Sequence, residues 1–306
     1  MTEALAIVGA TATGKTALSL ALAETIPAEV ISMDSRQIYR GMDIGTGKVE
    51  PAEATGVPHW GIDLVEPTES FSAGEFARAA RGWIGDIRDR GRLPLLVGGT
   101  GFYLRALVHP VFREPELDRE RTARLRSYLA QVPLERLEDL VGALDPVRAE
   151  MAVAGGRQRM SRTVELALLT GRPLSWWHAS APPEAPPVAA RTVHLILDRD
   201  ELHRRIDARV RSMVGKGLAD EVRGLLDAGC STESPGMSAM GYREMAEHLA
   251  GRISLEEAID LMTRSTRHYA RRQLTWFRNQ LPADTVQVSA ALALDAQVGA
   301  ALEAIR

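Results

Sequence analysis

The sequence is poor in the features that define disulfide-linked, metal-clustered or membrane-spanning proteins. Its 306 residues contain one cysteine, Cys230, which cannot form an internal disulfide or a metal cluster, so we interpret it as a small, partly buried residue. No apolar run reaches the roughly 18 residues that span a bilayer, and residues 1–10 lack the basic and long apolar regions of a secretory signal. We therefore expect a cytoplasmic protein with no membrane partner, and we expect a monomer.

Lysine is also scarce, and the chain has no excess of positive charge. Lys15, Lys48 and Lys216 are the only lysines, so 34 of the 37 cationic side chains are arginines. The formal net charge of −3 gives no global sign of nucleic-acid binding, and any such binding must come from local patches. With 45% hydrophobic and 25% charged residues, the composition is that of a globular protein. The length suits one large α/β domain or a core with an insertion.

Four short apolar runs are typical of buried parallel strands, and they alternate with helical patterns. A helix at 15–26 follows the first run and ends near Pro27, while Ser72 and Glu75 form a capping box before an amphipathic helix that ends near Gly91. This alternation predicts an α/β fold with a doubly wound parallel sheet, whose ligands bind beyond the carboxyl ends of the strands. The predicted strands are 4–8, 29–33, 93–97 and 193–197.

The middle of the chain shows a different pattern. Residues 115–169 contain no convincing strand, and charged helical stretches dominate at 118–130 and 157–169. A proline-rich linker at 181–187 then precedes the return strand. We predict a catalytic core made of residues 1–114 and 190–306, with C-terminal helices, interrupted by a helical insertion domain at 115–189.

The segment after the first predicted strand matches the phosphate-binding pattern G-x-x-x-x-G-K-[ST]. The glycines let backbone N–H groups wrap a phosphate, the helix N-terminus adds its positive end, and the lysine adds a charge. The Thr16 hydroxyl is placed to contact Mg²⁺, which we expect as a cofactor. The motif predicts a P-loop NTPase-like core that binds a diphosphate or a triphosphate. It comprises Gly9, Ala10, Thr11, Ala12, Thr13, Gly14, Lys15 and Thr16.

Two other strand ends carry candidate chemistry. Asp34 follows the second predicted strand, so its carboxylate faces the same crevice as the P-loop. A carboxylate there can hold Mg²⁺, act as a general base, or only cap a helix or turn. The run from Gly98 to Gly101 follows the third strand and supplies backbone N–H groups and the Thr100 hydroxyl, although a tight turn without a ligand is the plain alternative.

Several motifs, taken in their order along the chain, resemble those of the tRNA dimethylallyltransferases. The resemblance runs from residue 9 to about residue 280, and the C-terminal zinc finger of the eukaryotic members has no counterpart, as in a bacterial-type enzyme. The matching segments are the P-loop, Asp34 to Tyr39, Asp43 to Thr46, Gly98 to Leu104, Gln158 to Arg162, Gly241 to Glu244 and Arg272 to Arg278.

The resemblance implies transfer of a dimethylallyl group from dimethylallyl diphosphate to N6 of the adenosine on the 3′ side of the anticodon, position 37, of tRNA. The partner would be the anticodon stem-loop. Asp34 resembles the general base, which also recognises the adenine, and Thr100 and Arg209 resemble transition-state and diphosphate contacts. The residues implied in tRNA binding are Ser35, Arg36, Gln37, Gln158, Arg159, Met160, Ser161, Arg162, Gly241, Tyr242, Arg243, Arg271, Arg272, Gln273 and Arg278.

An arginine-rich helix is predicted after the capping box of Ser254 and Glu257. No acidic residue interrupts 264–278, which contains Arg264, Arg267, Arg271, Arg272 and Arg278. A solvated helix face is the plain reading of such a run, and the resemblance favours RNA. The opposite, largely apolar face is predicted to contain Leu255, Ile259, Met262, Thr266, Tyr269, Gln273 and Trp276.

Two other functions share some of these features. A P-loop small-molecule kinase would use Asp34 on Mg²⁺ or on a hydroxyl, but it leaves the arginine-rich helix without a role. An RNA-binding module switched by a nucleotide leaves the convergence of Asp34 and Thr100 unexplained. We interpret Trp176 and Trp177 as packing residues, and His59 lacks the second ligand that a metal site needs.

Overall fold

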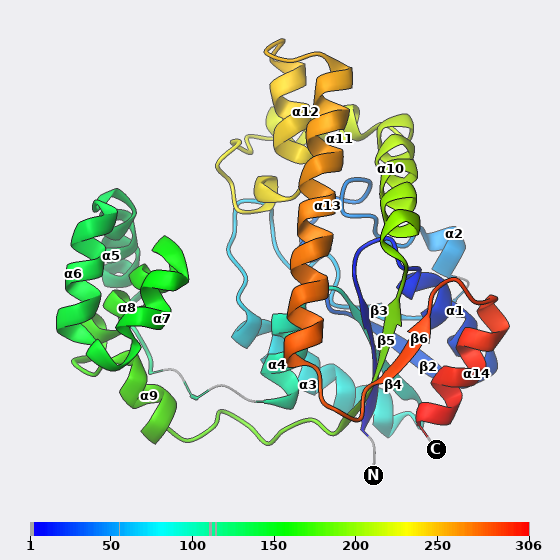
Figure 1. Cartoon of the computed structure of the whole chain (residues 1–306), viewed down its shortest axis with the longest axis horizontal. Helices are drawn as coiled ribbons and strands as arrows, with labels where there is room; N and C mark the ends of the chain where they lie inside the picture. The colour runs from blue at the N-terminus through cyan, green and yellow to red at the C-terminus, as the bar shows by residue number, and fades with distance from the viewer. Residues whose placement is uncertain (1–2, 55, 110–111, 114, 306) are drawn as a thin grey trace. The chain divides into compact units, whose positions relative to one another are not determined.

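The computed structural model describes residues 3–54, 56–109, 112–113 and 115–305. Its centre is a six-stranded sheet in the order β3-β2-β4-β1-β5-β6, in which every neighbouring pair is parallel. The doubly wound parallel sheet predicted from the apolar runs is therefore confirmed (Figure 1). The strands are β1 Ala4–Gly9, β2 Ala28–Ser32, β3 His59–Trp60, β4 Leu93–Gly98, β5 Ala190–Ile196 and β6 Val286–Ser289.

Helices cover both faces of this sheet because successive strand residues point to opposite sides. On β1, Leu5 and Ile7 pack with α1 (Lys15–Thr25) and α14 (Leu294–Ala304). Ala4, Ala6 and Val8 pack with the other layer, which holds α3 (Ala73–Asp89), α4 (Gly101–Val108) and the end of α13 (Leu255–Gln280). The strand is buried on both sides, which explains its unbroken apolar run.

A second apolar cluster lies beyond the carboxyl ends of the strands. It joins α10 (Arg199–Gly215), α11 (Leu218–Asp227), α12 (Tyr242–Leu249) and the first half of α13. Both predicted capping boxes are present: Ser72 with Glu75 begins α3, and Ser254 with Glu257 begins α13. The short helices α2 (Pro51–Ala54) and η2 (Gly236–Ser238) lie in the loops that follow β2 and α11.

The chain divides into two compact units, Met1–His109 with Val188–Arg306, and Pro110–Pro187. The second unit has a small apolar core of its own, which includes Leu137, Val141 and Val164. Trp177 packs against Phe112 and donates from Nε1 to Thr170 Oγ1 at 3.1 Å, as a packing residue does, whereas Trp176 is partly exposed. The helices of this unit are α5 Arg119–Gln131, α6 Leu134–Leu144, η1 Pro146–Arg148, α7 Ala149–Ala154, α8 Gly156–Thr170 and α9 Leu174–Ser180.

Some features of the chain agree with the sequence analysis and others were not predicted. Cys230 is buried in the cluster around α10 to α13, as expected of a packing residue. The two edge strands β3 and β6 were missed, since one has only two residues and the other begins with two exposed residues. Within the described part of the chain, no helix combines the length and the apolar composition needed to cross a membrane.

Candidate active site

The P-loop curls between β1 and α1 and is held by its own side chains. Lys15 Nζ donates to the carbonyl oxygens of Gly9 and Ala10 at 3.0 and 2.7 Å, and Thr13 Oγ1 donates to Ala10 O at 2.8 Å. The loop turns through Ala12, whose φ of 64° lies in the left-handed region. This arrangement leaves Thr11, Lys15 and the exposed Thr16 on the wall of a cavity.

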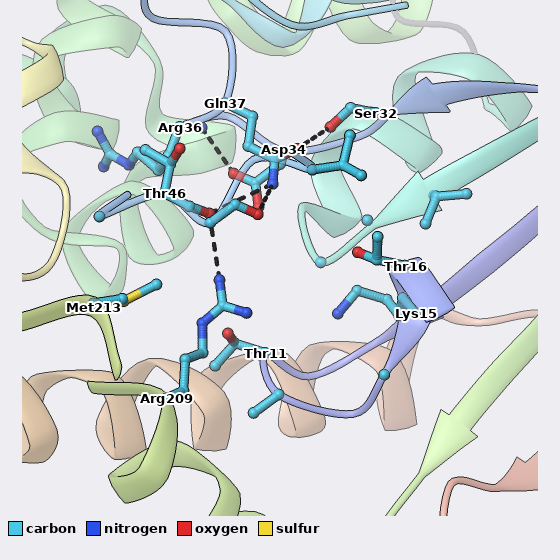
Figure 2. A pocket seen from close by; sticks show the side chains of 18 of the residues that line it. Thr11, Lys15, Thr16, Ser32, Asp34, Arg36, Gln37, Thr46, Arg209 and Met213 are labelled. Atoms are coloured by element: carbon cyan, nitrogen blue, oxygen red, sulfur yellow. Dashed lines mark hydrogen bonds between the residues drawn. The ribbon is translucent and has the colours of Figure 1, made fainter. Parts of the chain in front are cut away.

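The cations Lys15, Arg36 and Arg209 line that cavity with the Asp34 carboxylate (Figure 2), and Glu53 is a second acidic lining residue. Burial lowers the pKa of the Lys15 ammonium from 10.5 to about 8, while the Asp34 carboxylate opposes this effect and Arg209 adds to it. Burial also lowers the pKa of the Arg209 guanidinium, and Asp34 again opposes the effect. A bound anion would relieve both cations, so the charge pattern suits a phosphate ester.

Asp34 lies just beyond the carboxyl end of β2, where the sequence placed it. Its Oδ1 accepts a hydrogen bond from Arg36 N at 2.8 Å, which makes the residue part of a turn, and its carboxylate also lines the cavity. The neighbouring Gln37 is fixed at both ends of its amide: Oε1 accepts from Ser32 Oγ at 2.7 Å, and Nε2 donates to Gly47 O at 3.0 Å.

The predicted contact residue Thr100 lies beside the cavity rather than on its wall. Its Oγ1 accepts from Ser35 N at 3.1 Å and donates to Ser35 Oγ at 3.4 Å, so the hydroxyl ties the loop after β4 to the segment after β2. Thr100 therefore places Ser35, and it is Tyr269 that adds a side chain to the cavity wall.

The cavity has a volume of about 660 Å³ and joins polar and apolar walls. Its charged part is formed by the P-loop, Asp34 and Arg209, whose Nη2 donates to Thr46 O at 3.4 Å. Met213, Met240 and Met262 line an apolar part. Met262 was predicted only for the apolar face of its helix, and Met213 on α10 and Met240 in the turn before α12 were not predicted, because they match no local motif.

Gln273 on α13 braces the P-loop. Its Oε1 accepts from Thr11 N at 2.9 Å, its Nε2 donates to Gly99 O at 2.9 Å, and only 6% of the residue is exposed. The helix approaches so closely that a Cβ on Gly99 would lie 2.1 Å from Gln273 Nε2. The glycines after β4 thus admit α13. Gln273 was predicted to contact tRNA, which stays a prediction; its side chain joins the P-loop to the loop after β4 at the cavity wall.

Three further residues predicted to contact tRNA are enclosed by protein, and their contacts with tRNA stay predictions. Tyr242 is 0% exposed and donates from its hydroxyl to Glu221 Oε1 at 2.6 Å, while burial raises the pKa of its phenol. Gly241 is buried and its N–H donates to Glu244 Oε2 at 2.9 Å, which caps α12. Met160 is 2% exposed and belongs to the core of the second unit.

The other predicted tRNA residues are wholly or partly exposed. On α13, Arg271, Arg272 and Arg278 are exposed, with the Arg272 guanidinium 5.7 Å from the centre of the Tyr269 ring. Arg267 is different: it forms an ion pair with Asp207 of α10 at 2.5 Å, so it braces two helices rather than joining an open basic face. Arg264, the remaining arginine of the helix, is exposed.

The rest of these residues lie in three separate places. Arg36 and Gln37 line the cavity, and the Arg36 guanidinium donates to Ser238 Oγ at 2.8 Å. Arg243 on α12 is exposed. In the second unit, α8 carries the exposed Gln158 and Arg159 and the half-exposed Ser161 and Arg162, with Arg162 paired to Glu165 at 2.5 Å.

Among the described residues, no group of three or more His, Cys, Asp or Glu side chains is placed to hold a metal ion. His59 lines the cavity, but its Nδ1 is hydrogen-bonded to the carbonyl oxygen of Val57 at 2.8 Å. Taken together, the parallel sheet, the P-loop and the cavity define a P-loop α/β protein whose cavity suits a phosphate ester.

Comparison with known proteins narrows this class. A family model described as IPP transferase matches residues 37–280, and one described as isopentenyl transferase matches residues 2–62. A tRNA dimethylallyltransferase from Geobacillus thermodenitrificans is 43% identical over 286 residues, 93% of this chain and 90% of the relative. One from Halorhodospira halophila is 43% identical over 298 residues, 96% and 95% of the two chains. The chain belongs to the tRNA dimethylallyltransferase family.

Solved structures agree with this assignment. The full-length tRNA isopentenylpyrophosphate transferase from Bacillus halodurans aligns with a TM-score of 0.70 at 38% identity, over 99% of this chain and 98% of that one. A eukaryotic dimethylallyltransferase described as acting on tRNA aligns with a TM-score of 0.82 at 26% identity, over 95% of this chain and 74% of that one. The family resemblance seen in the ordered motifs is thus confirmed.

Proposed function

We propose that this protein transfers the dimethylallyl group of dimethylallyl diphosphate to N6 of the adenosine on the 3′ side of the anticodon, position 37, in tRNA. In this reaction the bond from the allylic carbon to diphosphate oxygen breaks, a carbon–nitrogen bond forms, and N6 loses a proton. One observation carries the proposal: a single cavity holds the P-loop, the Asp34 carboxylate, Arg209 and an apolar wall of methionines.

The phosphate end of the cavity suits a diphosphate leaving group. Negative charge grows on that group as the carbon–oxygen bond breaks, so the Lys15 ammonium, the Arg209 guanidinium and P-loop N–H groups lower the barrier when they meet it. Thr16 presents an exposed hydroxyl beside Lys15, a ligand type that Mg²⁺ accepts together with phosphate oxygens. Bound there, Mg²⁺ would neutralise part of the diphosphate charge.

The apolar part of the cavity suits the five-carbon chain. Met213, Met240 and Met262 are flexible, polarisable side chains that adapt to a small branched hydrocarbon. A kinase acceptor would need polar partners at this position, because a buried hydroxyl without a hydrogen bond costs about 1–3 kcal/mol. The mixed wall therefore favours prenyl transfer over phosphoryl transfer to a small polar molecule.

Asp34 is proposed as the general base. The exocyclic amino group of adenine is weakly basic because it is conjugated with the ring, so its proton must be accepted as it attacks the allylic carbon. The Asp34 carboxylate lines the cavity, with Arg36 and Gln37 beside it. The target base must leave its stack to enter, and an unpaired anticodon-loop base does so at low cost.

The surface of α13 is the proposed binding surface for the tRNA backbone. Arg271, Arg272 and Trp276 line a surface hollow of about 410 Å³, which offers cations to phosphates and an aromatic ring to a base. Arg278 and, separately, exposed residues of α8 such as Arg159 are further proposed tRNA contacts, because the family resemblance assigns both segments to tRNA. A monomer working in the cytoplasm, where tRNA is processed, completes the proposal.

The test is a transfer assay with two possible donors. Purified protein with Mg²⁺, dimethylallyl diphosphate and unmodified tRNA should yield dimethylallyladenosine, measured by mass spectrometry of digested nucleosides. ATP replaces dimethylallyl diphosphate in the second arm, and a small-molecule mixture replaces tRNA as acceptor. Release of ADP there, with no prenylated adenosine in the first arm, would favour a kinase and overturn the proposal.

A further inference from the structure

One carboxylate outside the cavity collects four hydrogen bonds. Glu221, in the first turn of α11, accepts at Oε2 from the backbone N–H groups of Asp43 and Ile44, at 2.9 and 2.7 Å. Its Oε1 accepts from Gly45 N at 3.1 Å and from the Tyr242 hydroxyl at 2.6 Å. Three consecutive N–H groups of one loop therefore converge on a single side chain, which lies 176 to 178 positions away in the sequence.

That loop, residues 43–47, reaches the cavity on its other side. Gln37 Nε2 donates to the carbonyl oxygens of Gly47, at 3.0 Å, and of Thr46, at 3.4 Å. Arg209 Nη2 donates to the same Thr46 carbonyl at 3.4 Å. The 43–47 loop thus holds one side chain assigned to the nucleotide and one assigned to the diphosphate.

Close packing leaves the loop little room to shift independently of these partners. Gly47 has a φ of 62°, and a Cβ there would lie 2.1 Å from Arg209 Nη2. A Cβ on Gly45 would lie 2.5 Å from the Tyr242 ring, which is itself fully buried. The loop is therefore pressed between the Tyr242 ring and the Arg209 guanidinium, and a displacement of its backbone must move the arginine.

We propose that Glu221 is a positioning residue for the transfer reaction, acting through the 43–47 loop on Arg209 and Gln37. Glu221 does not line the cavity, so this role involves no contact with substrate. A carboxylate is required because four donors face it and it has two acceptor oxygens, whereas a carboxamide has one oxygen and brings an N–H₂ group against Gly45 N–H. The inference rests on the proposed function, since it assigns Arg209 to the diphosphate.

The structural half of the proposal is tested by amide hydrogen exchange on the full chain. Glu221→Gln should speed exchange at Asp43, Ile44 and Gly45 and leave exchange in the sheet unchanged. The matched control is Asp220→Asn, which alters the neighbouring exposed carboxylate, whose side chain pairs with Arg223. Unchanged exchange in residues 43–45 of the Glu221 variant would overturn the proposal. Faster exchange throughout the sheet would overturn it too, because Glu221 would then serve overall stability.

The functional half is tested by a double-mutant cycle. We expect Glu221→Gln to lower kcat/KM for transfer roughly 10- to 100-fold, because small misplacements of contact groups have effects of that size. Inorganic diphosphate should bind about tenfold more weakly to this variant. In an Arg209→Ala background the same change should weaken diphosphate binding less than about twofold, since coupled residues are not additive.

The outcomes separate this inference from the proposed function. Additive effects of the two substitutions on diphosphate binding would overturn the positioning role, even if the wild-type protein prenylates tRNA. Absence of transfer by the wild-type protein would overturn the proposed function, while the exchange and diphosphate measurements would still decide whether Glu221 places Arg209. Asp220→Asn should match wild type in every one of these measurements.

Discussion

Raising the pH from 7 to 9 should weaken diphosphate binding by titrating Lys15. Burial lowers the pKa of this ammonium to about 8 in the empty site, so it is mostly charged at pH 7 and mostly neutral at pH 9. A diphosphate binds the charged form and raises its pKa, since an opposite charge favours the ammonium. Affinity is therefore highest below pH 8 and falls above it.

The size of the effect follows from the pKa. The protonated fraction of a group with a pKa of about 8 falls from roughly 0.9 at pH 7 to roughly 0.1 at pH 9, so Kd should rise about tenfold over that range. Above pH 8 the slope approaches about tenfold per unit until the pKa of the occupied site is reached. Dimethylallyl diphosphate itself changes little in this range, because the last proton of a diphosphate ester is lost near pH 6 to 7, by analogy with phosphate esters whose last pKa is about 6.

Isothermal titration of dimethylallyl diphosphate at several pH values, in the absence of tRNA and with metal concentration held constant, measures this slope. Lys15→Met is the matched control, since it keeps much of the side-chain length but has no charge. The variant should bind weakly at every pH and show no slope above pH 8. A wild-type Kd that stays flat from pH 7 to 10 would refute the reasoning, because Lys15 would then keep its charge throughout.

Three other predictions concern the proposed general base Asp34, the hydrogen bonds of Gln273 and the exposed arginines of α13. Asp34→Asn should lower the single-turnover rate about 10²–10⁴-fold with both substrates still bound; a rate within about tenfold of wild type would remove Asp34 from the mechanism. Gln273→Ala removes the hydrogen-bond partners of Thr11 N–H and Gly99 C=O. Chemical denaturation should then show that the free energy of unfolding falls by about 2–5 kcal/mol. A fall below about 1 kcal/mol would contradict the role of Gln273 in holding the P-loop. Alanine at Arg271 and Arg272 should reduce the salt dependence of tRNA affinity by about one unit of slope per lost phosphate contact. Arg223→Ala, which changes an arginine on α11, should leave the slope intact, and an unchanged slope in the double variant would mean that the α13 arginines only face solvent.

The core and the phosphate end of the cavity could be predicted because their signals are local. A buried parallel strand is an unbroken apolar run, and a P-loop is eight consecutive residues that build their own turn. Strand β6 had no such signal: Val286 and Gln287 are exposed, and the strand exists because it pairs in register with β5. The sequence of a four-residue segment does not indicate that it will pair with a distant strand.

For Gln273, helical periodicity and the family motif led to different predictions. Helical periodicity places it on the same face as Met262 and Thr266, which are buried, whereas the family motif suggested a tRNA contact. Periodicity was the better guide to its side chain, because burial follows helix geometry while a motif reports only that a segment matters. Glu221, Met213 and Met240 had no sequence signal at all, since they meet the site only through tertiary packing.

Mapping the modified nucleotide tests the central claim most directly. Wild-type protein is incubated with dimethylallyl diphosphate and a tRNA anticodon stem-loop, and the fragments of the digested RNA are sequenced by mass spectrometry. A second stem-loop carries guanosine in place of the adenosine on the 3′ side of the anticodon. We predict one five-carbon group on that adenosine in the first RNA and none in the second. A group on another nucleotide, or equal modification of both RNAs, would contradict the account.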